Sequence, residues 1–210
     1  IADLRALEGA RRATRLQHVI GHLQLEGVLE QSIGTLSKGF RRRVGLAQAI
    51  MHDPPVLILD EPTDGLDPNQ KHEVRTLIND MARDKIIVIS THILEEVDAV
   101  CTRAIIISQG RIVADDTPAG LAARSRYHNA VSMQLEQPAQ FPAARAAVEA
   151  LPAVAQVEVS ERDARLTALP KSGTPILPAV SELAARTGLK LKELHLESGR
   201  LDEVFRTITS

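Results

Sequence analysis

The sequence is poor in aromatic residues and in cysteine. It has no tryptophan, one tyrosine, three phenylalanines and one cysteine, Cys101. A single cysteine excludes a disulfide within the chain and is typical of a reducing compartment. So few aromatic rings argue against a surface that stacks on the bases of single-stranded nucleic acid. Aliphatic side chains therefore have to form the core.

Long apolar runs and an excess of one charge are also lacking. No stretch approaches the ~20 apolar residues of a membrane-spanning helix, and the start IADLRALEGARR has no signal-peptide pattern. The 25 basic and 27 acidic side chains nearly balance, so charge demands neither nucleic acid nor an anionic membrane as partner. We therefore expect a soluble, cytoplasmic chain that binds no nucleic acid.

Helical and extended patterns alternate over about the first 125 residues. Ser37 predicts the N-cap of one helix, and Asp67 followed by Pro68 predicts the start of another. Residues 56–59 (VLIL) form a continuous apolar run, typical of a strand buried on both faces of a parallel sheet, and residues 86–90 predict a second such strand. This alternation indicates an α/β fold.

After about residue 125 the sequence becomes alanine-rich and is punctuated by proline. Residues 130–196 are expected to form strand, helix, strand, strand, helix and strand, and residues 201–208 a final helix. This βαββαβ order is the ferredoxin-like α+β plan. The sequence therefore predicts two domains, residues 1–125 and residues 126–210.

Two acidic residues, Asp60 and Glu61, directly follow the first predicted strand. Because ligands of open α/β sheets bind at the carboxyl ends of the strands, both carboxylates are expected at a ligand-binding edge. One can hold Mg²⁺ while the other orients or deprotonates a water. The alternative, that they only cap a turn, is about equally good for the pair taken alone.

Ser37, Lys38 and Gly39 stand at a predicted helix start, where free backbone N–H groups and the helix dipole favour a phosphate. Gly39 permits close backbone approach, although ordinary capping is the commoner role of such a serine. His92 follows the second strand and so shares the sheet edge of Glu61, although a lone histidine there is more often structural. The three arginines at 41–43 fan around the helix and are interpreted as a solvated face.

Four motifs in order carry a resemblance. LSKGF (36–40), VLILDEP (56–62), DGLD (64–67) and STH (90–92) together resemble the ATP-binding cassette (ABC) ATPases over most of residues 1–124. The signature motif is a variant, with Lys38 and Phe40 where glycine and glutamine are common. The resemblance implies a P-loop NTPase-like parallel sheet with a helical subdomain, and ATP and Mg²⁺ as cofactors.

The family also implies a role for each candidate residue. Asp60 matches the Walker B aspartate that supports Mg²⁺, and Glu61 the catalytic carboxylate that polarises water. His92 matches the switch histidine that senses the γ-phosphate. The remaining nucleotide contacts implied by the resemblance come from the signature and the D-loop: Ser37, Lys38, Gly39 and Asp67.

One part of the family pattern is missing. No G-x-x-x-x-G-K-[ST] phosphate loop (Walker A) occurs among the 210 residues, and neither the adenine-stacking aromatic residue nor the glutamine loop is found. By resemblance, Ile1 aligns just beyond the glutamine loop. We therefore expect an incomplete cassette, with weak nucleotide affinity and negligible turnover on its own.

The sequences of several segments resemble one branch of this family in particular. LSKGF, EPTDGLDPNQ and the ending LHLESGRLDEVFRTIT are similar to ABC-2 type exporters, nearest the gliding-motility-like ATP-binding proteins, which often carry a C-terminal appendage. This implies an ATP-hydrolysing subunit that powers export through a separate membrane permease at the inner face of the cell membrane. It also implies a head-to-tail homodimer, in which each signature completes the other subunit's phosphate loop.

Other classes of function stay open. A soluble ABC protein of DNA repair or translation would usually carry a coiled-coil insertion or two cassettes in one chain. A non-catalytic interaction module, which offers its signature to an intact partner, is motivated by the missing phosphate loop. For residues 126–210 we favour a packing or dimer-stabilising appendage over a regulatory or ligand-binding domain, because no charged or aromatic cluster in the sequence marks a pocket.

Overall fold

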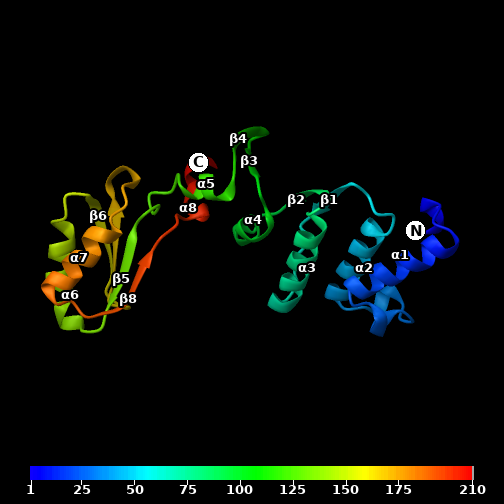
Figure 1. Cartoon of the computed structure of the whole chain (residues 1–210), viewed down its shortest axis with the longest axis horizontal. Coiled ribbons are helices and arrows are strands. Elements are labelled where there is room, and N and C mark those ends of the chain that lie inside the picture. Colours follow the sequence, from blue (N-terminus) through cyan, green and yellow to red (C-terminus); the bar gives the residue numbers. More distant parts are fainter. Residues whose placement is uncertain (210) are drawn as a thin grey trace. The chain divides into compact units, whose positions relative to one another are not determined.

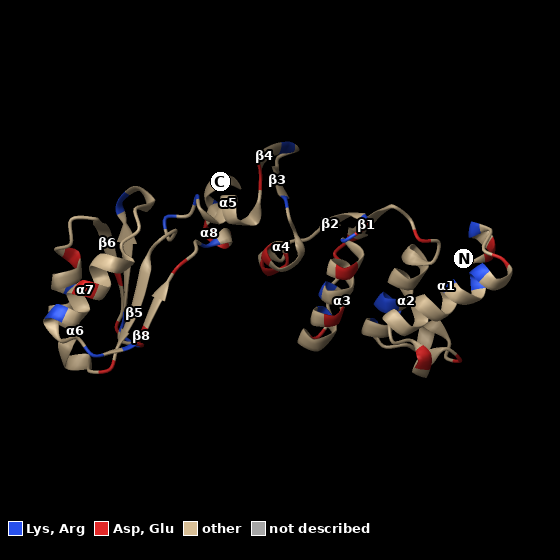
Figure 2. Cartoon of the chain, in the orientation of Figure 1, with Lys and Arg blue, Asp and Glu red and all other residues tan. Residues whose placement is uncertain are grey.

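The chain forms two compact units, residues 1–100 and residues 101–210, and the computed structural model describes residues 1–209 (Figure 1). The boundary between these units lies earlier than the domain boundary near residue 125, and the division into domains 1–125 and 126–210 stays a prediction. No helix within residues 1–209 is long and apolar enough to cross a membrane. Figure 2 shows acidic and basic residues interspersed along both units.

The first unit is mainly helical, with one small parallel sheet. Its elements in chain order are η1 (Asp3–Arg5), α1 (Gly9–His22), η2 (Glu26–Val28), η3 (Ile33–Thr35), α2 (Lys38–Ile50), β1 (Val56–Asp60), α3 (Pro68–Met81), β2 (Ile86–Ser90) and α4 (Leu94–Val100). Helices α1, α2 and α3 share one aliphatic core with the inner side chains of both strands.

Two helices of this unit begin where the sequence predicts. The Ser37 hydroxyl accepts a hydrogen bond from the backbone N–H of Phe40 at 3.2 Å and so caps α2. The Asp67 carboxylate accepts one from the N–H of Gln70 at 2.9 Å and caps α3, which opens with Pro68. Both caps fix where the chain turns, and therefore where the signature and D-loop segments lie.

Strands β1 and β2 are parallel, with Asp60 paired to Ser90, so the residues that follow both strands lie at one edge. The prediction that β1 is buried on both faces is wrong. Leu57 and Leu59 are buried, whereas Ile58 is 75% exposed. The reason is that the helices of the first unit pack on one face of the sheet only, and no element of residues 1–100 covers the other face.

The second unit begins with an antiparallel hairpin and ends with a helix. Its elements are β3 (Ala104–Ser108), β4 (Arg111–Asp116), α5 (Pro118–Ala122), β5 (Val131–Leu135), η4 (Pro138–Gln140), α6 (Phe141–Glu149), β6 (Val154–Ser160), β7 (Arg165–Pro170), η5 (Lys171–Gly173), α7 (Leu177–Thr187), β8 (Leu191–Leu196) and α8 (Leu201–Thr209). Strands β3 and β4 pair as an antiparallel hairpin, and the register shifts at one irregularity between Ile106 and Ile107.

The four strands β5 to β8 form one antiparallel sheet in the order β6-β7-β5-β8. This order, with helices after the first and third strands, confirms the ferredoxin-like arrangement. The core lies between one face of the sheet and helices α6 and α7. It is filled by aliphatic side chains such as Val148 and Leu166, both fully buried, as the scarcity of aromatic residues requires.

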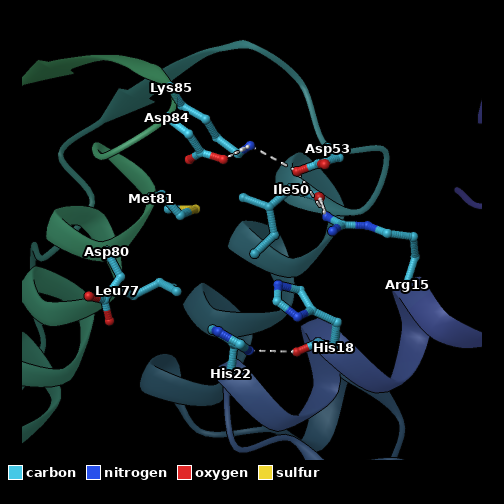
Figure 3. Close-up of a pocket in the computed structure, with 10 residues that line it drawn as sticks. All are labelled: Arg15, His18, His22, Ile50, Asp53, Leu77, Asp80, Met81, Asp84 and Lys85. Carbon is cyan, nitrogen blue, oxygen red and sulfur yellow. Dashed lines mark hydrogen bonds and ion pairs between the residues drawn. The ribbon is translucent and has the colours of Figure 1, made fainter.

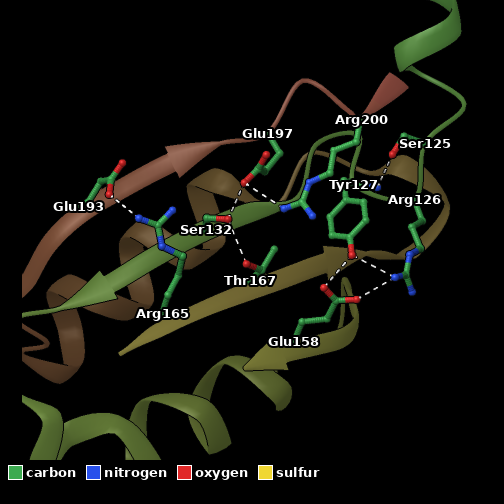
Figure 4. A network of polar contacts seen from close by, with 10 residues as sticks. All are labelled: Ser125, Arg126, Tyr127, Ser132, Glu158, Arg165, Thr167, Glu193, Glu197 and Arg200. Carbon is green, nitrogen blue, oxygen red and sulfur yellow. Dashed lines mark hydrogen bonds and ion pairs between the residues drawn. The ribbon is translucent and has the colours of Figure 1, made fainter. Parts of the chain in front are cut away.

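The other face of this sheet carries a connected polar network (Figure 4). The Tyr127 hydroxyl donates to Glu158 at 2.8 Å, and Arg126 forms an ion pair with the same carboxylate at 3.0 Å. The Arg200 guanidinium lies 3.7 Å from the centre of the Tyr127 ring. Burial, and then the bond to Glu158, raises the pKa of Tyr127. The buried Ser132 donates to Glu197 at 2.6 Å. The polar and charged side chains on this face are therefore paired with one another.

Candidate nucleotide-binding site

Glu61 and His92 meet at the carboxyl edge of the parallel strands. The Nδ1 atom of His92 lies 2.8 Å from Oε1 of Glu61. This hydrogen bond, together with the negative charge of Glu61, raises the pKa of His92. The His92 side chain is 69% exposed and that of Glu61 32%, so the pair can face a ligand from solvent.

The backbone at Glu61 is held in an unusual conformation. Its φ is +46°, in the left-handed region that non-glycine residues rarely adopt. The N–H of Glu61 donates to the carbonyl of Ser90 at 3.0 Å, and the N–H of Asp64 donates to the carbonyl of Glu61 at 3.2 Å. The carboxylate atom Oε2 is buried and has no hydrogen-bond partner among residues 1–209. A buried acceptor without a partner is costly, which is consistent with a site that receives a donor from outside the chain.

Asp60 ends β1 beside this pair, and its side chain is exposed. The hydroxyl of Ser90 donates to its Oδ1 atom. Within residues 1–209, no group of three or more His, Cys, Asp or Glu side chains is gathered so as to hold a metal ion. Mg²⁺ usually takes only one or two carboxylates and fills its other positions with water and phosphate oxygens. An exposed Asp60 at a ligand edge therefore fits Mg²⁺ that arrives with a nucleotide.

The signature residues lie against the D-loop segment of the same unit. The Lys38 ammonium is 3.5 Å from the Asp64 carboxylate, and a β-carbon added at Gly65 would lie 1.9 Å from that ammonium. At Gly39 an added β-carbon would lie 2.4 Å from Oε1 of Gln70. Gly65 has a φ of +67°, a conformation that favours glycine, whereas the atoms close to Gly39 are the end of a flexible glutamine side chain that can move aside. The Ser37 hydroxyl, which accepts the capping bond, keeps its own hydrogen for donation to an anion.

The candidate residues therefore form two groups. Glu61 and His92 contact each other beside Asp60, whereas Ser37, Lys38, Gly39 and Asp67 lie at the starts of α2 and α3. Their roles in binding and catalysis stay predictions. Sequence reasoning gave Asp60 no hydrogen-bond partner, although Ser90, whose hydroxyl donates to it, belongs to the STH motif at 90–92.

The interpretation of the three arginines as a solvated face is wrong for two of them. Arg43 is 9% exposed and pairs with the Glu73 carboxylate. Arg42 is half-buried and donates from Nη2 to the backbone carbonyl of Glu61 at 2.6 Å. Arg41 alone of the three is exposed. The three arginines do point in different directions around α2, as expected. Two of them, Arg42 and Arg43, point at other elements of the first unit.

A cavity of about 290 Å³ lies between α1, α2 and α3 (Figure 3). Arg15 spans one end and donates to the carbonyl of Ile50, the last residue of α2, and to that of Met51, which follows it. Burial, and then the neighbouring His22, lowers the pKa of His18 on its wall. None of the candidate site residues lines this cavity, so it is separate from the sheet edge.

Comparison with known proteins finds similarity to the ATP-binding proteins of ABC transporters. Residues 3–64 match the family model described as ABC transporter. The chain is 31% identical over 207 residues to the daunorubicin resistance ATP-binding protein DrrA2 of Streptomyces coeruleorubidus, covering 97% of this chain and 63% of that protein. It is 43% identical over 102 residues to the Nod factor export ATP-binding protein I of Burkholderia orbicola, covering 47% of this chain and 33% of that protein.

A solved structure shares the fold of part of the chain. It is described as the ATP binding subunit of an ABC transporter, with a TM-score of 0.52 and 31% identity, and covers 57% of this chain and 50% of that one. These similarities are all to nucleotide-binding domains of ABC ATPases. Residues 3–64 match an ABC transporter ATP-binding domain, and the chain spans 63% and 33% of the two curated relatives described above.

Proposed function

We propose that this chain works in the ATP-hydrolysing subunit of an exporter and drives a separate membrane permease. The observation that carries the proposal is the contact between Glu61 and His92 beside Asp60, at the carboxyl edge of two parallel strands. The names of the relatives, a resistance protein and an export protein, support a transport role. The proposed place of action is the inner face of the cell membrane.

In this proposal the site acts by positioning and by charge. Mg²⁺ neutralises charge on the phosphates when it is bound, and Asp60 helps to hold it. Glu61 orients the attacking water and accepts its proton. His92, kept close by Glu61, donates to the terminal phosphate. Positioning and preorganised charge account for most of the catalysis in phosphoryl transfer.

A second subunit completes the proposed site. Ser37, the backbone amides near Gly39 and the Lys38 ammonium serve the nucleotide of a partner cassette in a head-to-tail homodimer, and Asp67 orders the segment between the two sites. The phosphate loop has to come from sequence outside these 210 residues, since none of them matches its pattern. The 210-residue chain alone is therefore proposed to bind nucleotide weakly and to turn over negligibly.

The proposal is tested by Glu61→Gln in a full-length protein that includes the phosphate loop. Loss of the carboxylate removes the proton acceptor but keeps the side-chain volume, so we expect ATP to bind and hydrolysis to fall about 100-fold or more. Steady-state phosphate release and retention of labelled ATP measure the two effects. Glu30→Gln, at an exposed position, is the matched control and should hydrolyse normally.

Two results would count against this function. Unchanged turnover in the Glu61→Gln protein would remove Glu61 from the mechanism. Co-purification of the wild-type protein with ribosomes or DNA, and not with a membrane protein, would contradict the transport role and favour a soluble ABC protein. Binding of the chain to an intact cassette, without turnover of its own site, would favour an interaction module.

A further inference from the structure

One residue joins the two groups of the site. Arg42 belongs to α2, the helix that Ser37 caps, and its Nη2 atom donates to the backbone carbonyl of Glu61 at 2.6 Å. Its neighbours on the helix do something else, because Arg41 is exposed and Arg43 pairs with Glu73. Of these three arginines, Arg42 is the one directed at the turn that carries the hydrolytic carboxylate.

The turn it contacts needs outside support. Glu61 has a φ of +46°, a conformation that persists only where the surroundings hold it. Its carbonyl accepts two hydrogen bonds, one from the N–H of Asp64 at 3.2 Å and one from Arg42. The bond from a charged guanidinium is the stronger kind. Arg42 is thus the cation that holds this carbonyl.

The environment of Arg42 also shows that its guanidinium is not simply a charged group placed in solvent. Its Nε atom is buried and has no hydrogen-bond partner among residues 1–209. An arginine that served only to solvate the helix would place its guanidinium in water, where every donor is satisfied. In Arg42 the Nε donor has no acceptor, whereas the Nη2 donor bonds the carbonyl of Glu61. The contact with that turn is therefore the feature that the side chain is arranged to make.

The direction of the Glu61 side chain follows from its backbone. The carboxylate reaches His92 at 2.8 Å, and its second oxygen points into a buried place without a partner. A rotation of the turn would move both oxygens, and a displacement of about 1 Å is enough to impair a reaction that depends on alignment. Whatever holds the carbonyl of Glu61 therefore also holds its carboxylate.

We propose that Arg42 is a positioning residue that couples the signature helix to the hydrolytic carboxylate of the same subunit. When Ser37 and the start of α2 engage a nucleotide held by the partner, Arg42 transmits the position of α2 to the Glu61 turn. Hydrolysis at one site is thereby linked to closure at the other. This inference rests on the proposed function.

The test compares three variants of the full-length protein. Arg42→Ala removes the donor and is expected to lower kcat about 10- to 100-fold, with KM for ATP changed less than about two-fold, because alignment is lost and binding is kept. Arg42→Lys keeps a positive donor and should recover part of kcat, whereas Arg41→Ala, on the adjacent exposed residue, should behave as wild type.

A pH profile separates positioning from a general loss of structure. Since Glu61 raises the pKa of His92, a displaced Glu61 lets that pKa fall, and the limb of the kcat profile that follows His92 should move to lower pH in Arg42→Ala. A merely structural residue would lower the melting temperature and leave this limb in place. If Arg42→Ala does not fold, Arg42→Lys, which conserves bulk and charge, carries the same test.

The outcomes are distinct. Absence of hydrolysis in the wild-type protein overturns the proposed function and this inference with it. An active wild type with an Arg42→Ala variant that matches Arg41→Ala overturns the inference alone. A reduced kcat with an unmoved pH profile also overturns it, because Arg42 would then support the fold and not the carboxylate.

Discussion

At the scale of single residues, the contact of His92 with Glu61 makes a prediction about pH. The hydrogen bond and charge of Glu61 raise the pKa of His92 above its usual 6.5, so the pair stabilises the folded state fully below pH 6.5. This contribution is lost as pH rises through the raised pKa. Glu61→Gln should therefore lower the pKa of His92, which an NMR titration of the ring measures.

Asp64 provides the graded control for this titration, since its charge also raises the pKa of His92 but ranks behind Glu61. Asp64→Asn should lower that pKa by less than Glu61→Gln does. An unchanged titration in the Glu61→Gln protein would show that the 2.8 Å contact is not populated in solution.

The same scale shows what the sequence could predict of the site. Ser37 and Asp67 were predictable as caps because a cap depends on residues three positions away. The partner of Arg42 lies 19 positions away, and the direction of that side chain depends on how α2 packs beside β1. Local pattern therefore placed the candidate residues, and tertiary packing decided which of them touch.

At the scale of elements, the junction of α5 and α8 depends on Gly199. This glycine has a φ of +112°, and a β-carbon added there would lie 2.1 Å from the carbonyl oxygen of Ala122. Gly199→Ala should combine backbone strain with a clash and lower the free energy of unfolding by about 2 to 4 kcal/mol. Chemical denaturation of the purified chain measures the change.

Gly188 separates the two causes. It caps α7 with a φ of +66°, yet an added β-carbon there meets nothing within 4 Å. Gly188→Ala should therefore cost only about 1 kcal/mol, from the left-handed backbone alone. Equal losses in the two variants would contradict the role given to the Ala122 carbonyl.

Prediction of the elements succeeded where the pattern is local and repeated. The strand and helix order of the second unit led to the ferredoxin-like plan, and the sheet order β6-β7-β5-β8 confirms it. The burial of β1 was wrong because a continuous apolar run reports hydrophobicity and not what covers it. The run at residues 56–59 predicted burial on both faces of the sheet, whereas Ile58 is 75% exposed.

At the scale of the whole chain, the exposed face of the parallel sheet leads to a prediction about association in solution. One face of the parallel sheet presents four exposed aliphatic side chains: Val56 (49%), Ile58 (75%), Ile86 (65%) and Val88 (51%). A contiguous apolar face on a small sheet is a site of association. The 210-residue chain should therefore self-associate, with an apparent mass that rises with concentration in light scattering.

Ile58→Lys tests whether this face is the cause. Because Ile58 is already 75% exposed, the lysine should change the free energy of unfolding by less than about 0.5 kcal/mol while it reduces association. Leu59→Ala is the contrasting control: Leu59 is 7% exposed, so its truncation should cost about 2 to 5 kcal/mol without relieving association. A wild-type chain that stays monomeric at all concentrations, or an Ile58→Lys chain that associates as strongly as wild type, would show that this face does not govern how the chain behaves in solution.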